Sequence, residues 1–97
     1  MNHIFEISDK SGRKIHLSKE RWEHITIIHS EMTNYLEEIE QTVENPLKIT
    51  IHTKGDLRNY YLYLKHRKHP EKYLRVIVKY LNKHGFIITA HFVRQIK

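Results

Sequence analysis

The sequence predicts a single α+β domain in which two helices pack on one face of a four-stranded, mainly antiparallel sheet. Helical periodicity is concentrated between about residues 19 and 45, and four strand-like stretches with short polar connections follow Pro46. Helices segregated from sequential strands favour the α+β class and an antiparallel meander. A length of 97 residues allows one hydrophobic core and is too small for two domains, so residues 1–97 are expected to form one domain.

Two short strands are expected before the first helix. Residues 3–8 and 13–17 carry strand-forming side chains and flank the turn-forming run Asp9-Lys-Ser-Gly12. This pattern is typical of a small hairpin, or of two short strands around a turn.

The first helix is expected from about Lys19 to Ser30. Ser18 is a good N-cap for it, and Glu20 in the first turn complements the helix dipole. The side chains expected on its buried stripe are Trp22, Ile25 and His29, with Ile28 beside them.

The second helix is expected to be capped by Thr33 or Asn34 and to end at Asn45-Pro46. Its periodic apolar side chains predict one buried stripe, and its glutamates predict an exposed acidic face. The stripe is Tyr35, Leu36, Ile39 and Val43, and the acidic face is Glu37, Glu38, Glu40 and Glu44.

The four later strands are expected at about 47–53, 58–66, 73–82 and 86–95. Because strand side chains alternate with a period of two, the apolar faces of the last two strands coincide only if their loop has an odd number of residues. A three-residue Lys83-His84-Gly85 loop satisfies this condition, with Gly85 in the left-handed conformation. This register pairs Asn82 with Phe86, Val78 with Ala90, Lys79 with Thr89 and Ile77 with His91.

The same register predicts a surface with polar and basic side chains on the sheet face away from the helices. Lys79, Thr89 and His91 would lie next to one another there. The helices are expected to cover the other face, where the apolar side chains of Leu62, Leu64, Val76, Val78, Ile88 and Phe92 gather.

The composition narrows the class of protein. No cysteine is present, so a disulfide framework, a cysteine zinc site and a cysteine nucleophile are excluded. The formal charge is +6, and residues 54–97 carry eleven basic and two acidic side chains. Such a basic half favours a polyanionic partner, most often nucleic acid. No apolar run is long enough to span a membrane, so we expect a cytoplasmic protein with no membrane partner.

The uncovered sheet face is expected to bind RNA. Basic groups that follow phosphates, interleaved with aromatic rings on which bases stack, suit single-stranded RNA. The alternative is an ordinary solvated face, where tyrosine and threonine reflect β-propensity alone. The residues predicted to bind RNA are Arg58, Tyr61, Tyr63, Lys65 and Arg75.

A metal site is not expected, although the chain contains nine histidines. His24 and His29 lie five residues apart, which is about 140° around a helix, so both cannot face one ion. No other histidine spacing typical of a metal site is visible in a helix or strand. We therefore predict neither a metal nor another cofactor.

Metal-free cleavage of RNA is chemically possible with these residues. The 2′-hydroxyl of the RNA is the nucleophile, and a histidine near neutrality can act as the base or as the acid. A lysine stabilises the charge that grows on the phosphate, and a threonine hydroxyl donates to it. Lys79, Thr89 and His91 provide this set, and a helix histidine completes it if the end of the first helix reaches the sheet margin.

The order of short motifs resembles the phage-type nuclease-like domains grouped with barnase, EndoU, colicin D and RelE. The resemblance covers about Ile15 to Lys97. Its front half rests on Ile15-His-Leu-Ser-Lys-Glu-Arg-Trp-Glu-His24-Ile, His29-Ser-Glu31, Tyr35-Leu-Glu-Glu-Ile39 and Glu44-Asn-Pro46. Its back half rests on Tyr60-Tyr61, Val76-Ile-Val-Lys79 and Gly85-Phe-Ile-Ile-Thr-Ala-His91.

The resemblance implies the same α+β fold and a metal-independent ribonuclease, often in toxin or phage-related settings. His24 and His29 match the helix histidines of the family, Lys79 its strand lysine and Thr89 its final-strand hydroxyl. His91 stands at a position of more variable type. A toxin of this kind is expected to be neutralised by a cognate antitoxin or immunity protein.

Two other functions remain open from the sequence. One is a non-catalytic RNA-binding module, which would leave RNA intact. The other is a protein-interaction subunit that uses the acidic face of the second helix. The RNA target, the role of each histidine and the oligomeric state are not determined by the sequence.

Overall fold

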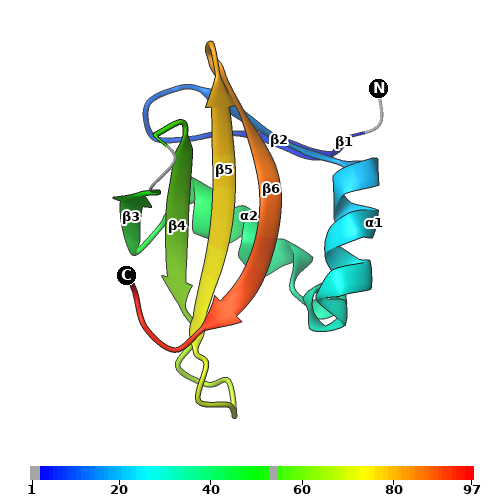
Figure 1. Ribbon diagram of the computed structural model, residues 1–97, viewed down its shortest axis with the longest axis vertical. Coiled ribbons are helices and arrows are strands. Elements are labelled where there is room, and N and C mark those ends of the chain that lie inside the picture. The colour runs from blue at the N-terminus through cyan, green and yellow to red at the C-terminus, as the bar shows by residue number, and fades with distance from the viewer. Residues whose placement is uncertain (1–2, 53–54) are drawn as a thin grey trace.

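The structure of the protein is a computed structural model that describes residues 3–52 and 55–97. It contains one sheet with two α-helices on one side of it, and the long strands β4, β5 and β6 form its centre (Figure 1). The elements are β1 (His3–Ser8), β2 (Lys14–Ser18), α1 (Lys19–Ile28), the 3₁₀ helix η1 (Ser30–Asn34), α2 (Leu36–Glu44), β3 (Lys48–Ile51), β4 (Leu57–Tyr63), β5 (Tyr73–Leu81) and β6 (His84–Val93). The expected end of the 47–53 strand and the start of its following connection, at residues 53–54, lie outside the described residues.

The α+β class is confirmed, but the sheet has six strands and is mixed, not four-stranded and antiparallel. The strand order is β1-β2-β6-β5-β4-β3. The N-terminal hairpin joins the sheet because Lys14–His16 of β2 pairs in parallel with His84–Phe86 of β6, while every other neighbouring pair is antiparallel. An isolated two-stranded hairpin is marginally stable, and pairing with β6 brings Ile15 and Leu17 into the core.

The helices follow the sequence closely at their buried positions and less closely at their ends. The Ser18 side chain accepts a hydrogen bond from the Arg21 backbone N–H at 3.1 Å, which confirms it as the cap of α1. The helix ends at Ile28 and not at Ser30, and Ile28 is exposed and outside the buried stripe. The N-cap residue of α2 is Tyr35, and its side chain makes no capping hydrogen bond. The expected caps Thr33 and Asn34 lie within η1 instead.

One core lies between the helices and the sheet. Ile25, Ile39 and Val43 of the predicted stripes are fully buried in it, and Trp22, Tyr35 and Leu36 pack against its edge. Each fully buried aliphatic side chain contributes about 1.5–3 kcal/mol relative to an exposed one. The sheet contributes Ile15, Leu17, Tyr60, Leu74, Val76, Val78, Ile87, Ala90 and Phe92, and the segment between the helices contributes Met32. Within the described residues, no helix is both long and apolar enough to cross a membrane.

The β5–β6 hairpin differs from its predicted register. Its loop has two residues, Asn82 and Lys83, and Asn82 takes the left-handed conformation with φ 59°. A β-bulge then places Val78 opposite Ile87 and Ile77 opposite Thr89, so Ile88 has no partner of its own. A two-residue loop alone would place the apolar faces of β5 and β6 on opposite sides of the sheet. The extra residue of the bulge brings them back to the same side. As a result Ile87, and not Ile88, enters the core.

Gly85 has a different role from the one predicted for it. It lies inside β6, opposite Tyr80, and not in the turn. A Cβ at this position would lie 2.9 Å from Tyr80 Cε1 and 3.0 Å from both Ile15 Cγ1 and Val78 Cγ1. The glycine is therefore needed for the close approach of side chains from β2 and β5 to the β6 backbone.

Candidate active site

The surface predicted from Lys79, Thr89 and His91 is not assembled as expected. Lys79 lies opposite Phe86, and His91 lies opposite Arg75. Four residue positions of β5 therefore separate Lys79 from the level of His91, which is about 13 Å along the strand. The Lys79 Nζ atom lies 3.8 Å from Oδ2 of Asp56, the residue that directly precedes β4. Thr89 and His91 still share one face, because they are two residues apart in β6.

His91 instead has a histidine neighbour from the first helix. The ring centroids of His29 and His91 are 5.4 Å apart, with 36° between the ring planes. His29 follows α1 directly and has φ −122° and ψ 76°, so the chain leaves the helix there. Since β2 pairs only with the first part of β6, the later part of β6 lies beside the end of α1. The end of α1 thus reaches the sheet margin, and the histidine there contacts His91 and not Lys79.

Arg75 completes this group from the neighbouring strand. It stands opposite His91, and its Nε and Nη2 atoms donate to Asn59 Oδ1 at 3.3 and 3.1 Å. The Asn59 amide nitrogen donates in turn to Thr50 Oγ1 at 3.1 Å. Because these bonds go to a neutral amide, the guanidinium keeps its charge available for an anion. We call His29, Arg75 and His91 the His–Arg cluster.

The sequence analysis missed Asn59, which is only 5 % exposed. It is the third residue of β4, between Arg58 and Tyr60. A polar amide inside a strand of this kind is unusual, because asparagine is depleted from strands. That signal alone could have marked the position.

The surroundings of His91 favour its neutral form. Burial lowers the pKa of His91 below its ordinary value, and the positive charges of Arg75 and His29 lower it further. Glu31 and Glu71 oppose this shift but do not reverse it. A neutral imidazole at neutral pH is the form that a general base requires.

His24 is not part of the His–Arg cluster. It is exposed and lines an open depression on α1 together with Arg21, Glu23 and Ile27. His24 lies within α1, whereas His29 lies directly after its last residue, where the chain leaves the helix.

The structure corrects the predicted RNA-binding face at several positions. Tyr61 is only 1 % exposed, so its ring is not available for stacking. It lines a pocket with Arg75, Arg94 and Lys97, where the C-terminal segment passes in front of β5 and β4 (Figure 1). Arg58 alternates with Asn59 and so faces the helix side, where its Nη1 atom donates to the backbone oxygens of Gly55 and Leu57.

The other two predicted RNA-binding residues lie at the far end of β4. Tyr63 is the last residue of this strand and is 46 % exposed, with its ring 5.0 Å from that of Tyr73. Lys65 is beyond the strand, since β4 ends at Tyr63 and not at residue 66. Of the five residues predicted to bind RNA, Arg75 is the one that belongs to the His–Arg cluster.

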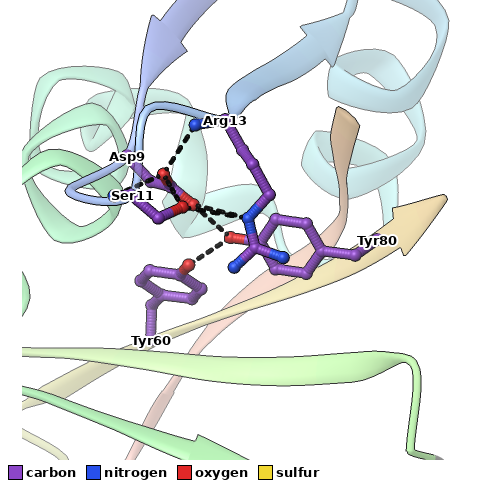
Figure 2. Close-up of polar contacts among 5 residues, drawn as sticks. All are labelled: Asp9, Ser11, Arg13, Tyr60 and Tyr80. Carbon is purple, nitrogen blue, oxygen red and sulfur yellow. Dashed lines mark hydrogen bonds and ion pairs between the residues drawn. The ribbon is translucent and has the colours of Figure 1, made fainter. Parts of the chain in front are cut away.

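A second polar network, on the helix side of the sheet, is occupied by its own hydrogen bonds. The Asp9 carboxylate accepts hydrogen bonds from the backbone and hydroxyl of Ser11, from the Arg13 backbone and from the Tyr80 hydroxyl (Figure 2). The Tyr80 hydroxyl also contacts that of Tyr60, and the Arg13 guanidinium lies 4.0 Å above the Tyr80 ring. This network fastens the β1–β2 turn to the sheet.

The charge state of Asp9 follows from these contacts. Burial alone would raise the pKa of its carboxyl, but the hydrogen bonds from Ser11, Tyr80 and Arg13 outweigh burial and hold the pKa below its ordinary value. Burial also raises the pKa of Tyr80, and the neighbouring Tyr60 and Asp9 raise it further. Asp9 is thus ionised and Tyr80 neutral at physiological pH, which suits a structural contact.

The part of the chain that the structure describes contains no group of three or more His, Asp or Glu side chains arranged to hold a metal ion. Imidazole rings can act in acid–base catalysis and a guanidinium can stabilise negative charge, and the His–Arg cluster contains side chains of both kinds.

The comparisons with known proteins agree with the sequence-based resemblance. A family model described as phage-Barnase-EndoU-ColicinE5/D-RelE like nuclease2 matches residues 4–97. The match covers nearly the whole chain and confirms the resemblance. No curated protein and no solved structure matched the chain.

Proposed function

The chain belongs to the family of phage-Barnase-EndoU-ColicinE5/D-RelE like nuclease domains, and from this premise we propose that it is a metal-independent endoribonuclease that uses the RNA 2′-hydroxyl as nucleophile. The observation that supports this proposal is the His–Arg cluster. Two imidazole rings 5.4 Å apart, beside a guanidinium held by Asn59, provide two proton-transfer groups and one phosphate-binding group.

In the proposed reaction His91 is the base, because its lowered pKa keeps it neutral. It takes the proton of the 2′-hydroxyl, and the 2′-oxygen attacks the phosphorus. As the bond from phosphorus to the 5′-oxygen breaks, His29 donates a proton to that leaving oxygen. The products are a 2′,3′-cyclic phosphate and a free 5′-hydroxyl. General acid–base catalysis of this kind contributes about 10²–10⁴-fold.

Arg75 and Thr89 act on the phosphate in this proposal. The Arg75 guanidinium neutralises the charge that grows on the non-bridging oxygens, and fixed donors are more effective than water because they need no reorganisation. Thr89 lies on the same face, two residues before His91, and its hydroxyl donates to the same group. Lys79 lies too far along β5 to join His91, so we assign it to the binding of an adjacent phosphate.

The test is cleavage of single-stranded RNA in EDTA by the wild type and by variants of the His–Arg cluster. We expect His91→Ala, His29→Ala and Arg75→Ala each to lose at least about 10²-fold in kcat/KM. His24→Ala is the matched control, since it removes a histidine from the same helix outside the cluster. A 2′-deoxy substitution at the scissile position should stop cleavage completely.

The proposal fails if the wild type leaves RNA intact at every concentration. It also fails if His91→Ala cleaves as fast as His24→Ala. Salt-sensitive binding with intact RNA would instead favour a non-catalytic RNA-binding module, which the net charge of +6 also supports.

We further propose that the protein is a phage-related or toxin–antitoxin ribonuclease that acts on cytoplasmic RNA and is neutralised by a cognate protein. The phage-type family supports this setting. Growth arrest on expression, relieved by the product of a neighbouring gene and absent for His91→Ala, is the outcome expected. Growth that continues normally with active enzyme would contradict a toxin role.

A further inference from the structure

Three aromatic rings lie at the other end of the sheet face that carries the His–Arg cluster. His16 of β2 pairs with Phe86 of β6, and their ring centroids are 5.3 Å apart with 24° between the planes. The His84 ring lies 5.1 Å from that of His16, at 29°, and 6.5 Å from that of Phe86, at 32°. We call His16, His84 and Phe86 the aromatic tile.

The rings of His84 and Phe86 both contact the His16 ring. A stack with His16 in the middle would place the His84 and Phe86 centroids well beyond the 6.5 Å that separates them, so these two rings lie side by side. In addition, His16 Nε2 and His84 Nδ1 are hydrogen-bonded at 2.9 Å, and a bond between ring nitrogens lies near the planes of both rings. The three rings are within about 30° of parallel, and the exposed aromatic surface consists of the His84 and Phe86 rings, because His16 is buried.

A chain of polar contacts holds this surface in place. The Glu6 carboxylate lies 3.1 Å from His16 Nδ1, and its other oxygen lies 3.1 Å from Lys14 Nζ. His16 Nε2 and His84 Nδ1 are hydrogen-bonded to each other, so Glu6 holds His16 and His16 in turn holds His84. Both imidazoles are then fixed in orientation, which lowers the entropic cost of binding a flat ligand.

Phe86 is 39 % exposed in spite of its size and apolar character, while His16 beside it is buried. Lys79 stands opposite Phe86 in the sheet, and Lys83 lies in the adjoining turn. Glu6 and Asp56 are the acidic groups nearby, and each is engaged with a lysine. A flat aromatic surface bordered by cations matches a nucleobase and its flanking phosphates.

The aromatic tile and the His–Arg cluster face the same side of the sheet. Phe86 and His91 are both on β6, and the bulge at Ile88 keeps both side chains on the face away from the core. Four residues lie between them, so the two positions are about 13–16 Å apart along the strand. A single strand of RNA that follows β6 would cover this length with a few nucleotides.

We propose that the aromatic tile is a subsite on which one nucleobase of single-stranded RNA stacks, a few nucleotides from the scissile phosphate. This inference rests on the proposed function for the position of the scissile phosphate. A base in a duplex is already stacked and paired, so the subsite selects unpaired RNA.

The experiment compares short and long RNA substrates. Phe86→Ala should cleave a dinucleotide at the wild-type rate, because a dinucleotide does not reach the tile. For a seven-nucleotide RNA, Phe86→Ala should bind about 5- to 150-fold more weakly, which corresponds to about 1–3 kcal/mol for one stacked base. Phe86→Trp should retain or improve this affinity. Binding is measured by fluorescence anisotropy with a fully 2′-O-methylated, uncleavable RNA.

Ile51→Ala is the matched control, because Ile51 is 72 % exposed on the edge strand β3, away from the tile. Equal affinity of Phe86→Ala and wild type for the seven-nucleotide RNA, or an equal loss in Ile51→Ala, overturns the subsite. If the wild type binds the long RNA through Phe86 but never cleaves, the subsite stands and the nuclease assignment fails. If cleavage depends on His91 while Phe86→Ala has no effect with RNA of either length, the nuclease assignment stands and the subsite fails.

Discussion

The imidazole rings of His29, which ends α1, and His91, which lies on β6, are 5.4 Å apart at the margin of the sheet. Two features of the fold create this contact. The helix stops one residue before His29, and β2 leaves the later part of β6 without a strand neighbour on that side. The end of α1 and the later part of β6 thereby meet, and each supplies one imidazole ring beside Arg75.

The pH dependence of activity should report the charge on Arg75. Its guanidinium lowers the pKa of His91, so Arg75→Ala should raise that pKa. Because the base must be neutral, the acid limb of the kcat/KM profile should move to higher pH in Arg75→Ala. NMR titration of the His91 ring should show the same direction. Arg75→Lys, which keeps the positive charge, is the control, and an unmoved acid limb in Arg75→Ala would contradict His91 as the base.

Asn59 should act as a positioning residue for Arg75. Asn59→Ala removes the acceptor of both guanidinium bonds, and we expect kcat/KM to fall about tenfold, since misplacing a phosphate-binding group by a fraction of an ångström weakens charge stabilisation. The informative measurement is a double-mutant cycle with Arg75→Ala. If Asn59 acts through Arg75, the effect on kcat/KM should vanish in the Arg75→Ala background. Additive losses would show that Asn59 acts independently of Arg75.

Gly85→Ala should destabilise the fold. The new Cβ would approach side-chain atoms of Tyr80, Ile15 and Val78 at 2.9–3.0 Å, all of them packed in or against the core. Overpacking of this kind costs about 1–3 kcal/mol. Chemical denaturation measures the loss, and Gly55→Ala is the control because its Cβ would meet nothing within 4 Å. Equal stability of the two variants would contradict the close approach at Gly85.

The Asp9 network should make stability depend on pH at its acid end. The folded-state pKa of Asp9 lies below its ordinary value of 3.8, so the ionised form contributes stability above that pH. This contribution is lost as the pH falls through the lowered pKa. Asp9→Asn should therefore lower the free energy of unfolding at pH 7 by about 1–3 kcal/mol, and the difference from wild type should shrink in acid.

Lys10→Ala is the control for this experiment, since Lys10 is exposed in the same turn. A difference between wild type and Asp9→Asn that is constant from pH 7 down to acid would rule out ionisation of Asp9 as its source.

The interactions between neighbours along the chain were predictable from the sequence. The Ser18 cap depends on Arg21 three residues away, and the buried positions Ile25, Ile39 and Val43 follow from helical periodicity. The hairpin register was not predictable, because an odd loop and an even loop with a bulge bury equivalent apolar faces. The choice between them depends on how Ile87 and Gly85 fit against β2, a strand far away in the sequence.

By itself, the sequence determined the α+β class, the presence of two helices and the nuclease-like family, because local propensity, periodicity and motif order carry that information. Tertiary structure alone decided which of those residues meet. It separated Lys79 from His91, buried Tyr61, and brought His29 and Arg75 to His91. The physical reason is that strand pairing and helix ends are fixed by packing across one core. There the side chains of Ile15 and Val78 pack directly against Gly85.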